Sequence, residues 1–508
     1  MPKILTCLPH APLLIRVDSS VDIGAGHIMR CLALAEAWHD FGGRVIFVVA
    51  KGAPEIETRL KSEGIEVFCL KTQAGGQDDA SQTTRLALKK GACWIVVDGY
   101  HFGAEYQKNI KNSGLHLLFI DDYGHAGYYY ADIILNHNAY ASESLYVNRS
   151  PSTKLLLGNR YALLRRDFLK WREYGRETLD VAHKVLVTMG GTDPHNVTLK
   201  VIRALQQIKV AKIEAVVVVG EFNQHYDELR TAAKDPRLSI RFESSTSNMS
   251  ELMAWADVAV SAAGVTSLEL AFMGIPNILL ILADNQRLVA EYMNKVGAAI
   301  NLGWHQDVSS DKIAEALTKL LADANMRREM AQRGRELVDG DGAVRVLMHM
   351  DDGIFHLRNA REDDCRLIWE WRNDPASLAV SFSSEPIPWE QHMKWFKTYD
   401  PNRKMYVAEN IDGVPIGQIR FDFKGNEAVA SITIDEKFRG KGYGSRLIRF
   451  ASKRTFTFSG IDLIHAYVKQ SNEASVRSFK NAGFKIHGPK IINGHEAIDM
   501  VLMRGDLR

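Results

Sequence analysis

Cysteine is scarce in this chain, and the cysteines that occur form no ligand pattern. There are five among 508 residues, an odd number, and none lies in a Cys-x-x-Cys or Cys/His ligand spacing. Scattered thiols of this kind are typical of reduced proteins of the cytoplasm, whereas disulfide scaffolds and structural zinc sites need paired or clustered cysteines. We therefore expect a cytoplasmic protein with no metal.

A long apolar run and an excess of charge of one sign are also missing. The apolar stretch Ile4–Val17 is interrupted by Pro9, His10 and Pro12 and carries Arg16 near its end, which fits neither a signal peptide nor a membrane span. Lysine and arginine number 63 against 61 aspartates and glutamates, so the formal net charge is only +2. Such a chain has no global field that attracts nucleic acid or an anionic membrane. We expect small-molecule partners, and the oligomeric state stays open.

The length and the order of apolar segments predict three domains, at residues 1–175, 176–350 and 355–508. In the first two, short apolar runs alternate with amphipathic helical patterns, which predicts α/β domains with doubly wound parallel sheets. The expected strands are Leu13–Val17, Val45–Ala50, Val67–Leu70, Trp94–Asp98, His116–Ile120 and Ile133–Leu135, then Lys184–Met189, Ala215–Gly220, Leu238–Phe242, Val258–Ser261 and Asn277–Ile281. Ligands of such sheets bind at the carboxyl ends of the strands, so the strand-to-helix turns are the candidate sites.

A glycine-rich turn leads into the first helix and carries a histidine. Residues 16–30 read RVDSSVDIGAGHIMR, so Gly24 and Gly26 permit a sharp bend and His27 stands at the start of the helix. The helix dipole attracts anions there and disfavours an imidazolium, so His27 should favour its neutral, base-competent form. An ordinary surface histidine at a helix start is the alternative. Asp18 is either a positioning partner of His27 or a turn residue.

Two glycine turns in the second domain follow strands directly and expose backbone N–H groups. One is TMGGTDP at 188–194, and the other is SAAGVTS at 261–267, which opens a helix. Both can hold phosphate groups, and Glu269, one turn into that helix, can bind vicinal ribose hydroxyls. Each turn alone is also an ordinary α/β turn. Together they predict a nucleotide diphosphate site, whose expected residues are Gly190, Gly191, Thr192, Gly264, Thr266, Ser267 and Glu269.

Residues 355–508 show the pattern of an antiparallel α+β domain. Strands are expected at Met405–Glu409, Ile416–Phe423 and Ala428–Ile434, joined by Asp412-Gly413 and Gly425-Asn426 hairpin turns. The last strand runs into FRGKGYGSRLI at 438–448, a basic glycine turn that opens an amphipathic helix and suits a diphosphate. A Rossmann interpretation is disfavoured here, because the strands belong to hairpins and no βαβ unit with an acidic ribose ligand follows.

The motifs of the first two domains resemble a known enzyme family. Residues from about 14 to 345 resemble the UDP-sugar hydrolases of the pseudaminic acid pathway, relatives of the two-lobed GT-B glycosyltransferases. The matching segments are RVDSSVDIGAGHIMR (16–30), VVDGY (96–100), FIDDYGH (119–125), ILNHNAY (134–140), YALLRRDF (161–168), TMGGTDPHN (188–196) and SAAGVTSLELAFMGIP (261–276).

This resemblance implies two Rossmann-like lobes of GT-B type and a specific hydrolysis. The implied reaction converts UDP-2,4-diacetamido-2,4,6-trideoxy-β-L-altropyranose to UDP and the free sugar, by attack of water with inversion. The matching catalytic histidine is His27, and Asp18 either orients it or binds the sugar. The implied substrate contacts outside the second-domain turns are Gly26, Arg30, Asn136 and Tyr140.

The third domain resembles the GNAT N-acetyltransferases. RGKGYG at 439–444 matches their pyrophosphate loop, and Asn472–Ser475 and Asn481–Phe484 match the later helix on the acetyl-CoA side. The resemblance implies acetyl-CoA as co-substrate and the 4-amino group of a UDP-4-amino-4,6-dideoxy-N-acetyl-altrosamine as acceptor. The implied acetyl-CoA contacts are Ile434, Arg439, Gly440, Lys441, Gly442, Tyr443, Gly444, Asn472 and Ser475. Candidates for the amino sugar or for acid and base roles are Arg372, Glu409, Glu427, His465 and Tyr467.

One position departs from the GNAT pattern. Many members carry a tyrosine seven residues after the Asn472 position, where it can protonate the leaving thiolate, and here that residue is Phe479. Another group or solvent must then supply the proton. Three alternatives stay open: a GT-B glycosyltransferase fused to a GNAT domain, a related pathway such as that of legionaminic acid, and a non-catalytic, ligand-binding GNAT domain. Release of UDP without an acceptor separates the hydrolase from the glycosyltransferase.

Overall fold

The computed structural model of the chain describes residues 11–18, 26–50, 54–191, 193–209, 213–220, 223–234, 238–243, 248–351 and 353–507. The chain divides into two compact units. One comprises Met1–Glu36 with Gly43–Val346, and the other comprises Ala37–Gly42 with Leu347–Arg508. The first unit contains two sheets and the second contains one.

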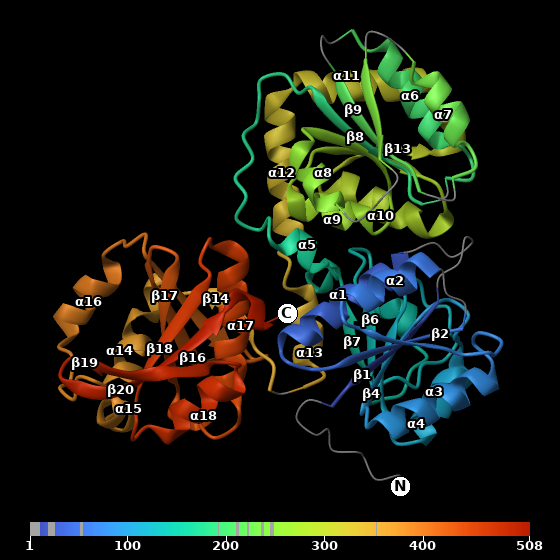
Figure 1. Cartoon of the computed structure of the whole chain (residues 1–508). Helices are drawn as coiled ribbons and strands as arrows, with labels where there is room; N and C mark the ends of the chain where they lie inside the picture. Colours follow the sequence, from blue (N-terminus) through green and yellow to red (C-terminus); the bar gives the residue numbers. More distant parts are fainter. Residues whose placement is uncertain are drawn as a thin grey trace. The chain divides into compact units, whose positions relative to one another are not determined.

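The first sheet is parallel throughout and has the strand order β3-β2-β1-β4-β5-β6-β7 (Figure 1). Its strands are β1 (Leu13–Val17), β2 (Val45–Val49), β3 (Glu66–Cys69), β4 (Trp94–Asp98), β5 (His116–Ile120), β6 (Ile133–Asn136) and β7 (Lys154–Leu157). The helices of this lobe are α1 (Gly26–Asp40), α2 (Pro54–Ser62), α3 (Gln77–Lys90) and α4 (Ala104–Asn112). Strands β1 to β3 are added in one direction across the sheet, and strands β4 to β7 in the other. The order therefore changes between β1 and β4, and ligands of such sheets bind at the carboxyl ends of the strands at this point.

The second sheet repeats this order, as β10-β9-β8-β11-β12-β13. Its strands are β8 (Lys184–Thr188), β9 (Glu214–Val218), β10 (Ser239–Glu243), β11 (Val258–Ala262), β12 (Asn277–Ile281) and β13 (Ile300–Trp304). The helices are α5 (Arg166–Leu169), α6 (Val197–Gln207), α7 (Tyr226–Ala232), α8 (Met249–Trp255), α9 (Thr266–Met273), α10 (Asp284–Lys295), α11 (Ser310–Ala322), α12 (Ala324–Leu337) and α13 (Gly342–Met348). Val185 and Val187 of β8 lie in one core cluster and Leu186 in another, so both faces of the sheet are buried.

The third sheet is mixed and has the order β14-β15-β16-β17-β18-β20-β19. Its strands are β14 (His356–Asn359), β15 (Arg403–Glu409), β16 (Pro415–Lys424), β17 (Glu427–Ile434), β18 (Leu463–Lys469), β19 (Lys485–Ile492) and β20 (His495–Met503). The helices are α14 (Cys365–Asn373), α15 (Pro375–Val380), α16 (Trp389–Lys397), α17 (Tyr443–Phe458) and α18 (Glu473–Asn481). β17 and β18 run parallel, whereas the other recorded pairs of this sheet are antiparallel.

The predicted fold class, two doubly wound α/β lobes followed by an α+β domain, is confirmed. The predicted bounds of β1, β4, β5 and β12 agree with the structure residue for residue. The sequence missed β7, β13, β14, β18, β19 and β20. Of these, β7, β13, β14 and β19 lie at sheet edges and are largely exposed or only partly buried, whereas β18 and β20 are interior strands of the mixed sheet. An edge strand does not need a continuous apolar run, so its pattern is weak. Among the described residues, no helix combines the length and apolar character needed to cross a membrane.

A buried ion pair lies inside the first lobe. Arg16 of β1 is fully buried, and its Nε and Nη2 donate to Asp79 of α3 at 2.9 Å and 2.6 Å. Asp79 also accepts hydrogen bonds from Tyr106, Thr83 and the backbone N–H of Gly75. Removing one partner of such a pair leaves a buried charge without full compensation.

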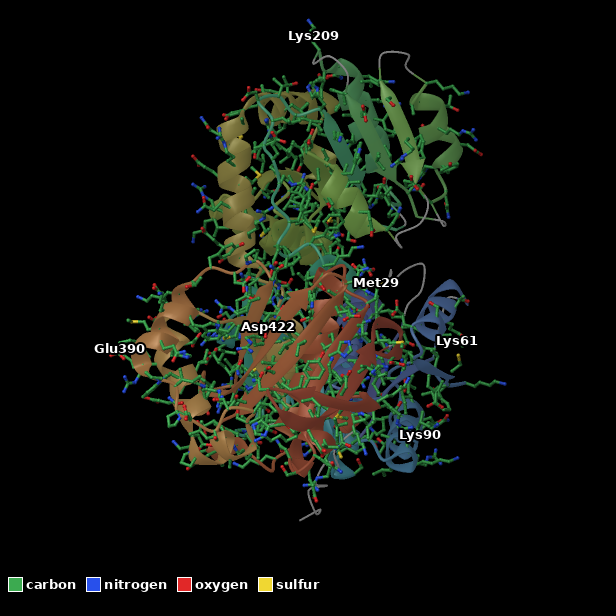
Figure 2. All side chains as sticks on the ribbon, turned by 60° about the vertical axis from the view of Figure 1, so that its left-hand side comes forward. Met29, Lys61, Lys90, Lys209, Glu390 and Asp422 are labelled. Carbon is green, nitrogen blue, oxygen red and sulfur yellow. The ribbon has the colours of Figure 1, made fainter. Side chains whose placement is uncertain are left out.

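We expect Asp79→Ala to lower the free energy of unfolding of the amino-terminal unit by about 3 to 5 kcal/mol. The control is Lys90→Ala, which breaks a surface pair between Lys90 at the end of α3 (Figure 2) and Glu66, 2.7 Å apart. A solvent-exposed pair contributes less than about 1 kcal/mol. Urea unfolding followed by circular dichroism measures both, and equal losses for the two variants would contradict the prediction.

Candidate functional site

Two side chains meet at the carboxyl ends of β1 and β4. His27 is the second residue of α1, and Asp98 is the last residue of β4, the strand next to β1. Nδ1 of His27 lies 2.7 Å from Oδ1 of Asp98. Nη2 of Arg30 also lies 3.0 Å from this nitrogen, but the carboxylate is nearer and only accepts, which favours the tautomer with the proton on Nδ1 and with Nε2 as the acceptor of the neutral ring. The imidazole is therefore oriented for proton uptake at Nε2.

The guanidinium of Arg30, one turn further along α1, holds this carboxylate in place. Its Nε and Nη2 each donate to Asp98 at 2.7 Å, and its Nη1 donates to Asp122 at 2.8 Å. Burial by itself would raise the pKa of Asp98, but the charges of Arg30 and His27 and their hydrogen bonds hold that pKa well below its usual value. Asp98 is therefore an ionised acceptor for His27. Arg30 is itself buried, and its guanidinium is hydrogen-bonded to the carboxylates of Asp98 and Asp122.

Tyr100, two residues after Asp98, completes this group. Its hydroxyl donates to Asp122 at 2.7 Å, and its ring meets the His27 ring edge to face, with centroids 4.9 Å apart. Nδ2 of Asn285, on α10 of the second lobe, lies 3.3 Å from the same hydroxyl. No role for Asp98 or Tyr100 was predicted from the sequence. The pattern that could have indicated them is Asp-Gly-Tyr at 98–100, polar residues directly at the end of a buried strand.

Asp18 does not contact His27, which corrects one of the roles considered for it. One of its oxygens lies 2.8 Å from Nη1 of Arg16 and accepts from the backbone N–H of Ala50 at 2.7 Å. Its other oxygen lies 3.0 Å from Nε2 of His101. Asp18 thus contacts the segments that follow β2 and β4, through Ala50 and His101, whereas His27 pairs with Asp98 at the end of β4. The carboxylate that orients His27 comes from a distant part of the sequence.

Asn136 and Tyr140 both donate hydrogen bonds to the backbone of Asp122. Asn136 is fully buried, and its Nδ2 donates to the backbone carbonyl of Asp122 and to the Tyr146 hydroxyl, both at 2.9 Å. The Tyr140 hydroxyl donates to the same carbonyl at 3.0 Å, and Nδ2 of Asn138 donates to the Asp122 carboxylate at 2.7 Å. Asn136 therefore supports the site from the interior, and this corrects its expected role as a substrate contact.

Gly26 is exposed at the start of α1.

The first glycine turn of the second lobe follows β8. Gly190 has φ of +91°, which favours glycine, and Gly190 and Gly191 are both exposed. The backbone carbonyl of Gly191 lies so close to Gly220 that a Cβ on Gly220 would meet it at 1.9 Å. This contact positions the turn. Thr192, the third residue expected there, lies outside the described residues.

The second glycine turn leads into α9, whose first residue is Thr266. Gly264 and Thr266 are partly exposed, so their backbone groups are accessible. The Ser267 hydroxyl is directed to the carbonyl of Gly264 at 2.7 Å, and Ser267 is fully buried, so it serves the turn and not a ligand. This corrects its expected role. Glu269 is partly buried, 3.9 Å from Arg165.

The basic turn of the third domain has the geometry of an anion site. Gly440 and Gly442 have φ of +76° and +83°, and Gly442 is the N-cap of α17, whose first residue is Tyr443. A Cβ on Gly444 would lie 3.3 Å from the Ser478 hydroxyl oxygen of α18, so glycine lets the two helices approach. The first turn of a helix has no acceptors within the helix for its N–H groups, which makes the amino end of α17 a suitable place for an anion. The Lys441 ammonium lies 5.5 Å from the ring centroid of Phe438.

Two residues expected to contact acetyl-CoA stabilise the fold with their side chains. Arg439 donates to the backbone carbonyl of Ile434 and to the Asp374 carboxylate, at 2.9 Å and 2.8 Å. Asn472 caps α18, because its Oδ1 accepts from the backbone N–H of Ser475 at 3.1 Å. These side chains therefore help to set the shape of the two turns, and their contacts to acetyl-CoA stay a prediction.

The other candidates of the third domain differ in their surroundings. Glu409 accepts from Nε of Arg358 at 2.6 Å and so has an ion-pair partner on β14. Arg372 donates weakly to the carbonyl of Ser383, 3.4 Å away, and burial together with the charge of Arg420 lowers its pKa. His465 is buried beside Asp499. Phe479 is buried against Phe484, with ring centroids 5.0 Å apart.

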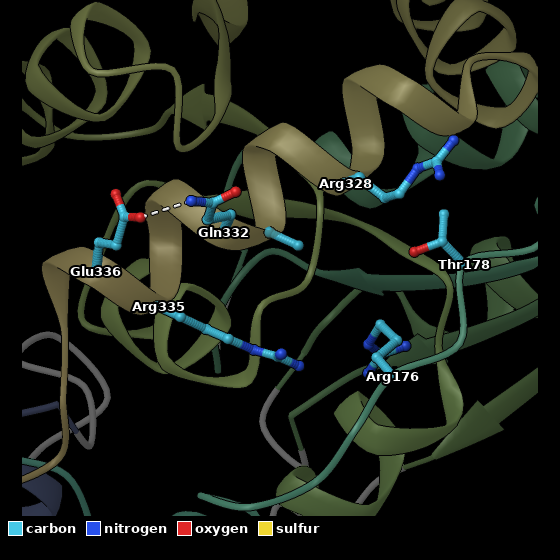
Figure 3. A pocket seen from close by; sticks show the side chains of 7 residues that line it. Arg176, Thr178, Arg328, Gln332, Arg335 and Glu336 are labelled. Carbon is cyan, nitrogen blue, oxygen red and sulfur yellow. Dashed lines mark hydrogen bonds between the residues drawn. The ribbon is translucent and has the colours of Figure 1, made fainter. Parts of the chain in front are cut away.

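A cavity of about 360 Å³ lies elsewhere in the second lobe (Figure 3). Its lining comes from α12 and from Arg176 and Thr178 of the segment that precedes β8, and Figure 3 shows the side chain of Arg335 directed toward Arg176. None of the residues predicted from the sequence lines it. In the part of the chain that the structure describes, no group of three or more histidine, cysteine, aspartate or glutamate side chains is arranged to hold a metal ion.

Comparison with known proteins gives a consistent result for both halves. Residues 185–342 match the glycosyltransferase family 28 C-terminal domain, and residues 355–485 match the acetyltransferase (GNAT) domain. A Methanocaldococcus jannaschii protein of uncharacterized function is 24% identical over 486 residues, which cover 92% of this chain and 95% of that relative. The fusion of the two halves therefore recurs in another protein.

Two further relatives each match only a part of the chain. The UDP-2,4-diacetamido-2,4,6-trideoxy-β-L-altropyranose hydrolase of Campylobacter jejuni is 28% identical over 47% of this chain and 81% of its own length. A Bacillus subtilis protein assigned by name to the phosphinothricin acetyltransferases is 36% identical over 22% of this chain and 70% of its own length. Through its carboxyl-terminal part, the chain belongs to the GNAT acetyltransferases, here fused to a two-lobed GT-B unit that is similar to a UDP-sugar hydrolase.

Proposed function

We propose that the chain is a bifunctional enzyme of pseudaminic acid biosynthesis. The GNAT domain transfers an acetyl group from acetyl-CoA to the 4-amino group of a UDP-4-amino-4,6-dideoxy-N-acetyl-altrosamine. The two-lobed unit then hydrolyses the product, UDP-2,4-diacetamido-2,4,6-trideoxy-β-L-altropyranose, to UDP and the free sugar. The steps are consecutive, because the amide made in the first is part of the substrate of the second. The similarity to the Campylobacter jejuni hydrolase supports the second step.

His27 is the general base of the hydrolysis. Its Nδ1–H is held by Asp98, so Nε2 accepts a proton from water as the water oxygen attacks the anomeric carbon. The bond from that carbon to the UDP oxygen breaks on the opposite face, and UDP leaves with the electron pair. The configuration at the anomeric carbon is thereby inverted. Asp98 is the positioning residue of His27.

The second lobe binds UDP. The developing charge on the leaving diphosphate is stabilised by backbone N–H groups of the turn at Gly190, Gly191 and Thr192 and of the turn at Gly264 and Thr266. Glu269 binds the ribose hydroxyls. The first lobe contributes Gly26, Tyr140 and the edge formed by Tyr100 to the sugar side. Acetyl-CoA is the co-substrate of the third domain, where its diphosphate binds the main chain from Gly440 to Gly444.

The observation that carries this proposal is the His27–Asp98 pair at the carboxyl edge between β1 and β4. A test incubates the full chain with the UDP-4-amino sugar and acetyl-CoA and identifies the products by mass spectrometry. We expect CoA, UDP and the free diacetamido sugar, with no acceptor added. Release of UDP that depends on an added hydroxyl acceptor would instead support a glycosyltransferase, and acetyl-CoA binding without turnover would support a ligand-binding GNAT domain.

We expect His27→Ala to abolish hydrolysis of the UDP-diacetamido sugar, because the proposed base is removed from its place beside Asp98. Affinity for UDP should stay within a few-fold of the parent protein, since UDP binds the second lobe. Turnover is measured as UDP release and affinity by calorimetry. His116→Ala is the control, because His116 lies at the amino end of β5. Near-normal turnover of His27→Ala would refute the base role.

We expect Asp98→Asn to lower kcat by about 10²- to 10⁴-fold, the usual contribution of a positioned acid or base. An amide can donate to Nδ1 and so favours the wrong tautomer of His27. The double variant His27→Ala/Asp98→Asn should be no slower than His27→Ala, because both changes remove one function. Losses that multiply in the double variant would show that Asp98 acts independently of His27.

We expect Gly442→Ala to raise KM for acetyl-CoA roughly 5- to 30-fold. A residue with a Cβ is strained by about 1 to 2 kcal/mol in the left-handed conformation that this turn requires. The matched control is Gly413→Ala, which imposes the same strain on a hairpin turn, where φ is +75°. An equal change of KM in both variants would mean that the turn at Gly442 does not bind the co-substrate.

A further inference from the structure

His465 lies in a chain of acidic and basic side chains on the GNAT sheet that the mechanism above does not use. It belongs to β18 and is buried, with an exposed fraction of 8%. Its Nδ1 lies 2.8 Å from Oδ1 of Asp499 on β20, and Asp499 is itself buried. As in the pair of the first lobe, the carboxylate accepts from Nδ1–H and leaves Nε2 as the basic nitrogen.

The register of the sheet places His465 where two strands separate. β17 and β18 pair only through Glu427–Val429 and Leu463–His465, with His465 opposite Val429. β17 continues to Ile434 and pairs with β16 along its whole length. Its other edge, from Ala430 to Ile434, is therefore not used by β18. His465 is the last residue of β18 before this opening.

The opening suits the extended arm of acetyl-CoA. β17 runs from the opening toward the turn at Gly440 and Gly442, where the diphosphate is proposed to bind. The arm carries amide groups, and an extended amide chain pairs with a free strand edge as an added strand does. With the diphosphate at the turn and the arm along β17, the thioester lies near the point where the strands separate, beside His465.

The face that carries His465 is the one covered by α14. Directly paired residues share a face, which places Val429, Ser431 and Arg420 on the side of His465. Trp371 and Ile368 of α14 pack against Val407 of β15. Val407 pairs with Gln418, and Gln418 pairs with Thr433, which lies on the same face of β17 as Val429 and Ser431. Arg372, also on α14, is influenced by the charge of Arg420 and has no carboxylate partner among the described residues. Arg420 itself pairs with Asp422, whose carboxylate lies 2.8 Å from its Nε, so the guanidinium of Arg372 is the group on α14 that can attract an anionic acceptor.

We infer that His465, positioned by Asp499, is the general base that deprotonates the acceptor amine. The inference rests on the proposed acetyl transfer. The acceptor ammonium gives one proton to Nε2 of His465, and the neutral amine then attacks the thioester carbonyl carbon. The new C–N bond forms, the C–S bond breaks, and CoA leaves as a thiolate with the electron pair. The second proton of the amine nitrogen goes through solvent to the thiolate, since Phe479 has none to give, and the imidazolium returns its proton to solvent.

Several charged or titratable groups face this histidine. Glu427, the first residue of β17, is exposed, and its carboxylate lies 3.5 Å from Nε2; it stands opposite Leu463, in the paired part of the two strands and not in the opening. His487, on β19, lies 3.3 Å from the second oxygen of Asp499 and is mostly exposed. Tyr467 follows on the same face of β18, and its hydroxyl lies 2.8 Å from Nζ of Lys490. Among these, Asp499 is the buried partner that fixes the orientation of the His465 ring.

The test compares the full chain with its His465→Gln and Asp499→Asn variants from pH 6 to pH 9. CoA release from acetyl-CoA and the UDP-4-amino sugar is followed with a thiol reagent. At neutral pH we expect kcat of His465→Gln to fall by about 10²- to 10⁴-fold, with little change in KM for acetyl-CoA. The deficit should shrink as the pH rises, because solution then supplies neutral amine without a base. Asp499→Asn should show a smaller loss with the same pH dependence.

The control is His487→Gln, which alters the exposed neighbour of Asp499 and should stay within threefold of the parent protein. UDP-sugar hydrolysis by the same variants reports on the integrity of the rest of the chain. A His465→Gln rate within threefold of the parent protein, or a deficit that does not change with pH, would overturn the base role and leave the proposed acetyl transfer standing. A parent protein that transfers no acetyl group to the amine would overturn both.

Discussion

The buried guanidinium of Arg30 is the interaction on which the first-lobe site depends. It binds Asp98 and Asp122 at once, and these two carboxylates come from the ends of neighbouring strands β4 and β5. Each carboxylate then serves a further side chain, Asp98 the ring of His27 and Asp122 the hydroxyl of Tyr100. A buried charge costs several kcal/mol unless it is paired and hydrogen-bonded, so the group is held in one arrangement. That arrangement gives the imidazole a defined tautomer.

The same histidine and aspartate pairing occurs in both units of the chain, on different scaffolds. In the parallel lobe, the pair joins the end of one strand to the start of a helix, at the edge where ligands bind. In the mixed sheet, His465 and Asp499 lie on adjacent antiparallel strands, next to the opening between β17 and β18. Both place Nδ1 of an imidazole beside a buried carboxylate. The arrangement fits two reactions that each need removal of a proton from a nucleophile.

Side chains that a motif assigns to a ligand can instead serve the fold. Arg439 and Asn472 of the GNAT motifs bind backbone and carboxylate groups of the protein, and Ser267 of the second lobe binds its own turn. These contacts set the shape of the turns, and the shape exposes backbone N–H groups. The proposed binding of phosphate at these turns depends on this main-chain geometry, and glycines with positive φ provide it at Gly190, Gly440 and Gly442.

The sequence by itself determined the local structure of this protein. Apolar runs that are buried on both faces located the central strands, and the glycine turns located the loops at their carboxyl ends, including that of His27. It could not locate the edge strands β7 and β13, whose partial burial weakens the pattern. Only the tertiary structure decided the partners. Asp98 lies 71 residues from His27, and Asp499 lies 34 residues from His465. Strand order sets these contacts, because a carboxylate meets an imidazole only when their strands become neighbours.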